Sequence, residues 1–136
     1  MAPMARFDHG RLQAQVTALF EPLGARAGLL VSGPFNLGQT ENFRVPDGGL
    51  HRGEPDSEAV YLDTAAVVVE IISPGDETYD KLPFYAAHGV DEVAVVDPAA
   101  RRVRMLVRSG DHYRDVEASA PLGVRAAELV AAIRWP

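Results

Sequence analysis

Residues 65–72, AAVVVEII, constrain the fold more than any other part of this sequence. Valine and isoleucine dominate the run, and β-branched residues favour strands. Because apolar side chains occupy both alternating sets of positions, both faces of the strand have to be covered by other parts of the chain. A strand of this kind lies in the middle of a sheet that carries helices. The segment therefore predicts an α/β or α+β fold.

Apolar periodicity predicts a helix near the N-terminus, with Asp8 as its N-cap and with Pro22 and Gly24 at its end. The strand–helix–strand order from residue 65 to residue 97 suits a parallel pair of strands. We therefore expect a mixed β-sheet flanked by helices. The remaining expected elements are strands over 28–32, 91–97, 102–108 and 112–117, a broken extended segment over 43–52, and helices over 80–88 and 126–133.

The composition limits the classes of function. The chain has 136 residues, which favours one domain, and it has no cysteine, which excludes disulfides, thiolate zinc sites and cysteine nucleophiles. Its formal net charge of -6 argues against a protein that coats nucleic acid. No apolar run approaches the roughly 20 residues of a membrane span, and the N-terminal stretch lacks the apolar core of a signal peptide. We therefore expect a cytoplasmic protein without a membrane partner.

Three charged residues depart from the local pattern, and each also has an ordinary explanation. Glu70 lies in the apolar strand, so it has to meet a metal ion, the open end of the sheet or an arginine. Lys81 is the one lysine beside twelve arginines, in a first helical turn where a cation opposes the helix dipole; otherwise it is a solvated surface residue. Asp47 follows a proline and precedes two glycines, which suits either a metal site or a Pro-Asp-Gly turn.

Other polar residues give weaker signals. The four histidines show no spacing typical of a zinc site. Arg102, Arg104 and Arg108 lie on one side of a predicted strand, which makes them candidates for contact with phosphate groups. A solvated outer face explains these arginines at least as well, and we leave them out of the candidate site.

The order of the three charged residues is typical of PD-(D/E)XK nucleases: an acid after proline, a second acid in an apolar strand 23 residues later, and a lysine beyond it. The chain also resembles one family of that superfamily, the Uma-type putative restriction endonucleases. The resemblance covers essentially the whole chain and implies one restriction-endonuclease-like domain over residues 1–136, without the family's N-terminal segment. It is carried by PDGGLHR at residues 46–52, VVVEIISPGDETYDKLPFYAAHGVDEVAVVDP at 67–98 and LGVRAAELVAAIRWP at 122–136.

The resemblance implies roles for individual residues. Asp47 matches the family's first metal-binding aspartate, and Glu70 matches the acidic residue of the strand motif. The superfamily often has its lysine two residues after that acid, but Ile72 stands there. In this family the lysine is on the following helix, where Lys81 stands. Tyr85 matches the family's tyrosine, although core packing explains this residue equally well.

Together these residues predict a Mg²⁺-dependent endonuclease that hydrolyses phosphodiester bonds of DNA, with Mn²⁺ as a substitute metal. Asp47, Glu70 and the backbone carbonyl of Ile71 would hold the ion, and Lys81 would orient the attacking water or stabilise the transition state. Cleavage of both strands of a duplex would favour a homodimer. The alternative is a catalytically silent module that keeps the nuclease fold for binding or assembly, and the net charge of -6 favours it.

Overall fold

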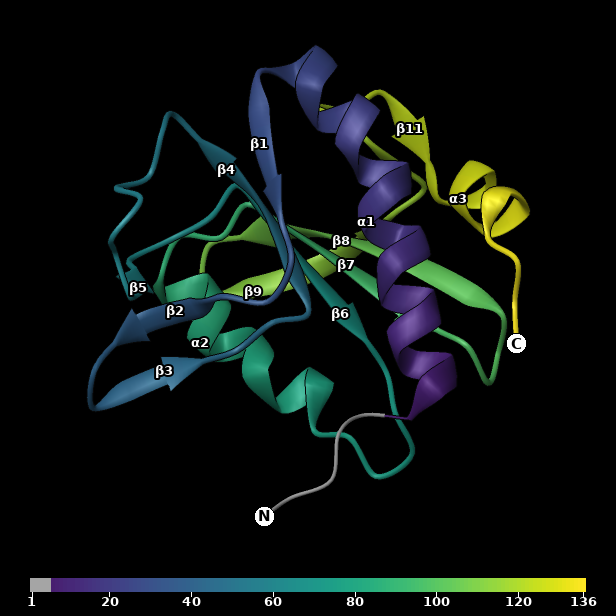
Figure 1. Cartoon of the computed structure of the whole chain (residues 1–136), viewed down its shortest axis with the longest axis horizontal. Helices are drawn as coiled ribbons and strands as arrows, with labels where there is room; N and C mark the ends of the chain where they lie inside the picture. The colour runs from purple at the N-terminus through teal and green to yellow at the C-terminus, as the bar shows by residue number, and fades with distance from the viewer. Residues whose placement is uncertain (1–5) are drawn as a thin grey trace.

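The central strand expected from the sequence is β6 (Val67–Ile71), and all of its residues are buried. The structure, a computed structural model, describes residues 6–136 (Figure 1). Within that range, β6 lies inside a six-stranded sheet with the order β1-β4-β6-β7-β8-β9. Residues 1–5 belong to the stretch considered for a signal peptide and lie outside the described residues. The predicted mixed sheet flanked by helices is confirmed.

The main sheet is antiparallel except for the pair of β6 and β7, which run parallel. This exception is the strand–helix–strand unit that the sequence predicts. It brings the carboxyl ends of both strands to the same end of the sheet. Besides β6, the strands of this sheet are β1 (Leu29–Ser32), β4 (Gly48–Arg52), β7 (Glu92–Asp97), β8 (Arg102–Ser109) and β9 (His112–Val116).

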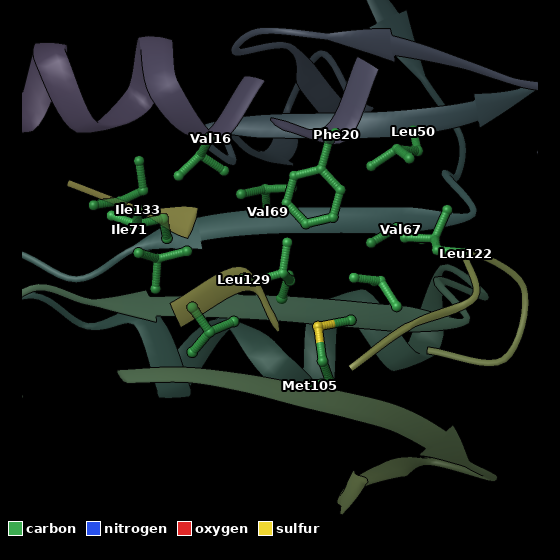
Figure 2. Packing of buried hydrophobic residues seen from close by; sticks show 14 of the residues in the cluster. Val16, Phe20, Leu50, Val67, Val69, Ile71, Met105, Leu122, Leu129 and Ile133 are labelled. Carbon is green, nitrogen blue, oxygen red and sulfur yellow. The ribbon is translucent and has the colours of Figure 1, made fainter. Parts of the chain in front are cut away.

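Helices cover both faces of the main sheet (Figure 1). They are α1 (Phe7–Ala27), the 3₁₀ helix η1 (Thr78–Lys81), α2 (Leu82–Ala87) and α3 (Ala126–Ala132). α1 and α3 pack on one face, where Val16 and Phe20 of α1 meet apolar side chains of β6 and β8 (Figure 2). α2 packs on the other face, where Tyr85 joins a cluster with Val68 and Val93. Cover on both faces explains why β6 is apolar throughout apart from its glutamate.

Two small sheets add to the expected pattern. Their strands have two to four residues, too few to give a periodic signal in the sequence. The break expected at Pro46 is confirmed, because β3 ends before this proline and β4 begins after it. One small sheet has the order β3-β2-β5 and the other pairs β10 with β11. These strands are β2 (Asn36–Gln39), β3 (Asn42–Arg44), β5 (Tyr61–Leu62), β10 (Ala118–Ser119) and β11 (Val124–Arg125).

The first helix is longer than the sequence predicts, and the expected end at Pro22 and Gly24 is wrong. α1 continues to Ala27 and is closed by Gly28, which has a φ of 74° in the left-handed region. Pro22 lies on the exposed side of the helix, so the carbonyl that loses its partner there can bond to water. Gly24 is a packing residue, since a Cβ atom would lie 2.7 Å from Cγ2 of Val31 in β1.

The starts of the helices also differ in detail from the expectation. Asp8 is not the N-cap of α1, because Arg6 holds that position and Asp8 lies in the first turn, where its charge suits the helix dipole. The predicted second helix begins as a 3₁₀ turn and ends as expected before Gly89, whose φ is 73°. Among residues 6–136, no helix combines the length and apolar character that crossing a bilayer requires.

Candidate active site

Asp47 lies directly before β4 and is bonded to both residues that flank Glu70 in β6. Its backbone N–H donates to the carbonyl of Val69 at 3.0 Å, and its Oδ2 accepts the N–H of Ile71 at 2.7 Å. Two residues far apart in the sequence are therefore fixed side by side at the end of two paired strands. This linkage brings the two sequence-predicted acids to one end of the sheet.

Glu70 is the buried centre of this group, with a relative exposure of 2%. It lies on the face of the sheet covered by α2, where two donors reach the same carboxylate oxygen. Nζ of Lys81 lies 3.4 Å from Oε1, and the hydroxyl of Tyr85 donates to Oε1 as well. The buried glutamate of the apolar strand thus meets the only lysine of the chain. The third predicted residue belongs to the same cluster.

Burial changes the protonation of Glu70. The pKa of its carboxyl group is raised to about 7, chiefly by desolvation and with a smaller contribution from the nearby negative charge of Asp47. The hydrogen bond from Tyr85 and the charge of Lys81 act in the opposite direction. Burial and the Glu70 charge also raise the pKa of Tyr85 far above its ordinary value, so this hydroxyl stays a donor. Burial therefore disfavours the charged form of Glu70, and an additional cation beside the carboxylate would stabilise that form.

His9, near the start of α1, also contacts Asp47, and the sequence reasoning missed this residue. Its Nε2 lies 3.2 Å from Oδ1 of Asp47, and its Nδ1 lies 3.1 Å from Oγ of Ser73. The imidazole therefore connects the first acid to the chain that follows β6. No spacing rule reveals such a contact, since His9 and Asp47 are 38 positions apart. Their proximity depends on how α1 docks on the sheet.

Gln13 is one helical turn after His9 and makes a second link from α1 to the same aspartate. Its Nε2 donates to the backbone carbonyl of Asp47 at 2.8 Å. Residues four positions apart share one helix face, so both side chains reach Asp47 together. The start of α1 thus holds the backbone and the carboxylate of Asp47 in place.

Carboxylate oxygens are the groups that this site offers to a cation. Both donors to Glu70 end on Oε1, so Oε2 receives no donor from the described part of the chain. Residues 6–136 contain no cluster of three or more His, Asp or Glu side chains arranged for a metal ion. Any metal would therefore depend on two carboxylates together with backbone groups or water. The expected contribution of the Ile71 carbonyl stays a prediction.

The arginines of β8 are less available for phosphate than their spacing suggests. Nη2 of Arg104 lies 2.6 Å from a carboxylate oxygen of Asp115, and Nε of Arg104 bonds its other oxygen at 2.9 Å. Nη2 of Arg108 lies 3.5 Å from Asp91, which also pairs with Arg52. Two of the three candidate arginines thus have carboxylate partners on the protein itself.

The family was identified by comparison with family models. The model of the Uma2 family, described as "Putative restriction endonuclease", matches residues 1–134. The chain belongs to the Uma2 family. This membership agrees with the resemblance found in the sequence, and the family's description supports a nuclease-like function. No curated protein matches this Uma2 chain.

Solved structures show the same fold at low sequence identity. The crystal structure of a putative nuclease belonging to DUF820 from Anabaena variabilis has a TM-score of 0.71 and 15% identity to the Uma2 chain, covering 96% of this chain and 84% of the other. A cryoEM structure of a DrdV–DNA complex has a TM-score of 0.53 and 18% identity. That match covers 93% of this chain but 11% of the other chain, so the fold corresponds to a small part of it.

Proposed function

We propose that this Uma2 protein is a metal-dependent endonuclease that hydrolyses phosphodiester bonds of DNA at Asp47, Glu70 and Lys81. One observation carries the proposal. Asp47 is bonded to both chain neighbours of Glu70, while Nζ of Lys81 lies 3.4 Å from Oε1 of Glu70. Two acids and one ammonium group from three separate segments thus meet at one end of the sheet.

The donor set of the site fits Mg²⁺, with Mn²⁺ as a substitute. Mg²⁺ binds oxygen ligands, uses one or two protein carboxylates and keeps several waters. Asp47 and Glu70 supply the carboxylates, and the Ile71 carbonyl is the proposed backbone ligand. Oε2 of Glu70 has no donor from residues 6–136, and burial disfavours the bare negative charge of this group. A cation beside Glu70 would relieve that unfavourable charge.

A bound divalent ion supplies charge neutralisation at the phosphate and lowers the pKa of a water molecule. The protein's own residues provide the remaining functions. Lys81 directs an ammonium group with three donors toward the site, where it would stabilise negative charge on the phosphate oxygens. Tyr85, which is fully buried, fixes Oε1 of Glu70 through its hydroxyl. His9 and Gln13 hold Asp47.

DNA is the substrate that the comparisons favour. The family is described as "Putative restriction endonuclease", and the DrdV structure is a complex with DNA. With a net charge of -6, the protein would contact few phosphates rather than coat a duplex. A homodimer, with one site for each strand, would suit double-strand cleavage.

Plasmid nicking in Mg²⁺, Mn²⁺ and EDTA tests the proposal. Glu70→Gln and Lys81→Met should each abolish nicking in both metals, and EDTA should abolish it for the unaltered protein. Glu92→Gln is the matched control, because Glu92 is also buried but lies at the other end of the sheet, bonded to Ser119. The proposal is supported if Glu70→Gln and Lys81→Met lose nicking activity while Glu92→Gln keeps it.

Equal nicking by all variants would overturn it. So would an unaltered protein that neither nicks DNA nor binds Mn²⁺ in calorimetric titration. That second outcome would favour the binding or assembly module, which needs no metal.

A further inference from the structure

Arg44, the last residue of β3, lies against α2 in a defined geometry. Its guanidinium carbon is 4.4 Å from the centroid of the Phe84 ring, which is a cation–π distance. Nη1 also donates to Oδ1 of Asn42 at 3.2 Å and to the carbonyl of Phe43 at 3.0 Å. The Phe84 ring in turn stacks on His88 at 4.1 Å. These contacts hold the guanidinium group in one orientation although the residue is only half-buried.

Arg44 has no carboxylate partner within residues 6–136. Arg104 pairs with Asp115 of β9, and Arg52 and Arg108 both pair with Asp91, the residue directly before β7. Both groups that accept hydrogen bonds from Arg44 are neutral oxygens, and both bonds use Nη1. Its positive charge is therefore not neutralised by the protein, and Nε and Nη2 remain available as donors.

The position of Arg44 connects it to the candidate active site by two routes. Along the chain, it stands three residues before Asp47. Through space, the Phe84 ring beneath the guanidinium lies 6.4 Å from the ring of Tyr85, whose hydroxyl bonds to Glu70.

We propose that Arg44 binds a phosphate of the nucleic-acid strand that flanks the phosphate being cleaved. This inference rests on the proposed function, since it assigns a substrate contact to the same site. A guanidinium group offers donors in a planar fork that matches two phosphate oxygens. Stacking on Phe84 fixes the plane in advance, so less side-chain freedom is lost on binding. Adjacent phosphates of one strand are about 3.4 Å apart along the duplex axis, so a strand bound at the candidate site carries further phosphates beside the reacting one.

A DNA-binding assay tests the inference. Fluorescence anisotropy of a labelled DNA duplex is measured in Ca²⁺ over a range of NaCl concentrations. Arg44→Ala and Arg44→Gln should each weaken binding by about tenfold at low salt, the scale of a lost charge-assisted hydrogen bond. They should also reduce the magnitude of the salt slope by about 1, as expected for one lost phosphate contact. The glutamine variant can keep a bond to Asn42 or to the Phe43 carbonyl in the hairpin of β2 and β3, which guards against a folding defect.

Arg26→Ala is the control with the same charge change. Arg26 is exposed near the far end of α1, 17 residues from His9, or about 25 Å along the helix. This variant should leave the affinity and the salt slope unchanged. In nicking assays, the Arg44 variants should raise KM for DNA without changing the Mn²⁺ concentration that gives half-maximal activity.

The outcomes separate this inference from the proposed function. If the protein nicks DNA but the Arg44 variants match Arg26→Ala in affinity and slope, the Arg44 contact is wrong and the nuclease proposal stands. If the Arg44 variants lose affinity while the unaltered protein neither nicks DNA nor binds Mn²⁺, the contact of Arg44 with a DNA phosphate stands and the nuclease proposal fails. Absence of any DNA binding by the unaltered protein overturns the inference.

Discussion

Tyr85 donates a hydrogen bond to Oε1 of Glu70, and both side chains are almost fully buried, with relative exposures of 0% and 2%. The bond joins α2 to β6 in the interior of the molecule. It also aims one oxygen of Glu70 at a fixed donor and leaves the other oxygen for a different partner. The orientation of the acid is thus set by a residue that does not itself need to contact the substrate.

Replacement of this tyrosine tests that relationship. Tyr85→Phe should weaken Mn²⁺ binding in calorimetry and should lower the free energy of unfolding by about 1–3 kcal/mol, the cost of a buried polar group that loses its partner. Tyr113→Phe is the matched control, because the Tyr113 hydroxyl donates to the backbone carbonyl of Val90 at 2.6 Å, away from Glu70. A similar loss of Mn²⁺ affinity in both variants would contradict a specific role for Tyr85.

Glu70 should make the metal-free protein less stable as pH rises. Its pKa is about 7 in the folded protein and ordinarily 4.5, so the folded state binds the proton more tightly than the unfolded state. Below pH 4.5 both states are protonated and Glu70 has no effect. Between about 4.5 and 7 stability is lost progressively, and above 7 the full cost is present, on the order of 3 kcal/mol.

Glu70→Gln removes this titration and should therefore be more stable than the unaltered protein at pH 8 in EDTA. The difference in unfolding free energy between the two proteins should shrink toward pH 4.5, because all other titrating groups are common to both. Urea unfolding between pH 4.5 and pH 8 measures this difference. Parallel stability curves would show that Glu70 does not carry the predicted charge penalty.

His9 should affect metal binding more than stability. Groups that orient metal ligands typically contribute about 10–100-fold to metal affinity or activity. We expect His9→Ala to weaken Mn²⁺ binding and to slow nicking within that range, while the unfolding free energy changes little. His112→Ala is the control, because His112 is exposed and pairs with Asp111 in the turn after β8. Unchanged Mn²⁺ affinity in His9→Ala would leave the imidazole a purely structural link.

Gly24 and Gly10 should respond in opposite directions to alanine. At Gly24 a Cβ atom would lie 2.7 Å from Cγ2 of Val31 and 3.2 Å from the carbonyl oxygen of Leu29, so Gly24→Ala should cost about 1–3 kcal/mol. At Gly10 a Cβ atom meets nothing within 4 Å, so Gly10→Ala should stabilise α1 by about 0.5–1 kcal/mol. Thermal unfolding of the two variants compares them directly, and equal shifts would contradict the packing role of Gly24.

The parts of the fold that the sequence predicts are those with strong local patterns. The apolar run around Glu70 predicts the central strand, because burial on both faces excludes the alternating pattern of a surface strand. Gly89 marks the end of the second helix correctly, since its positive φ suits glycine. Gly24 led to the wrong helix end, because the sequence alone does not distinguish a glycine that permits close packing from one that ends a helix.

The candidate site is predictable only in part for a similar reason. Asp47, Glu70 and Lys81 each break a local rule, so they can be singled out before the fold is known. His9 and Arg44 break no such rule, and their contacts depend on the docking of α1 and on a short hairpin that periodicity does not reveal. No local pattern in the sequence predicts either of these tertiary contacts.

Asp47 bonds to Val69 and Ile71 through the alignment of β4 with β6, so this alignment is itself a component of the candidate site. Sliding one strand past the other by a single position would turn its side chains to the opposite face and separate the two acids. Insertion of one residue between Asp47 and Leu50 should therefore abolish the proposed nuclease activity even if every charged group remains in the chain.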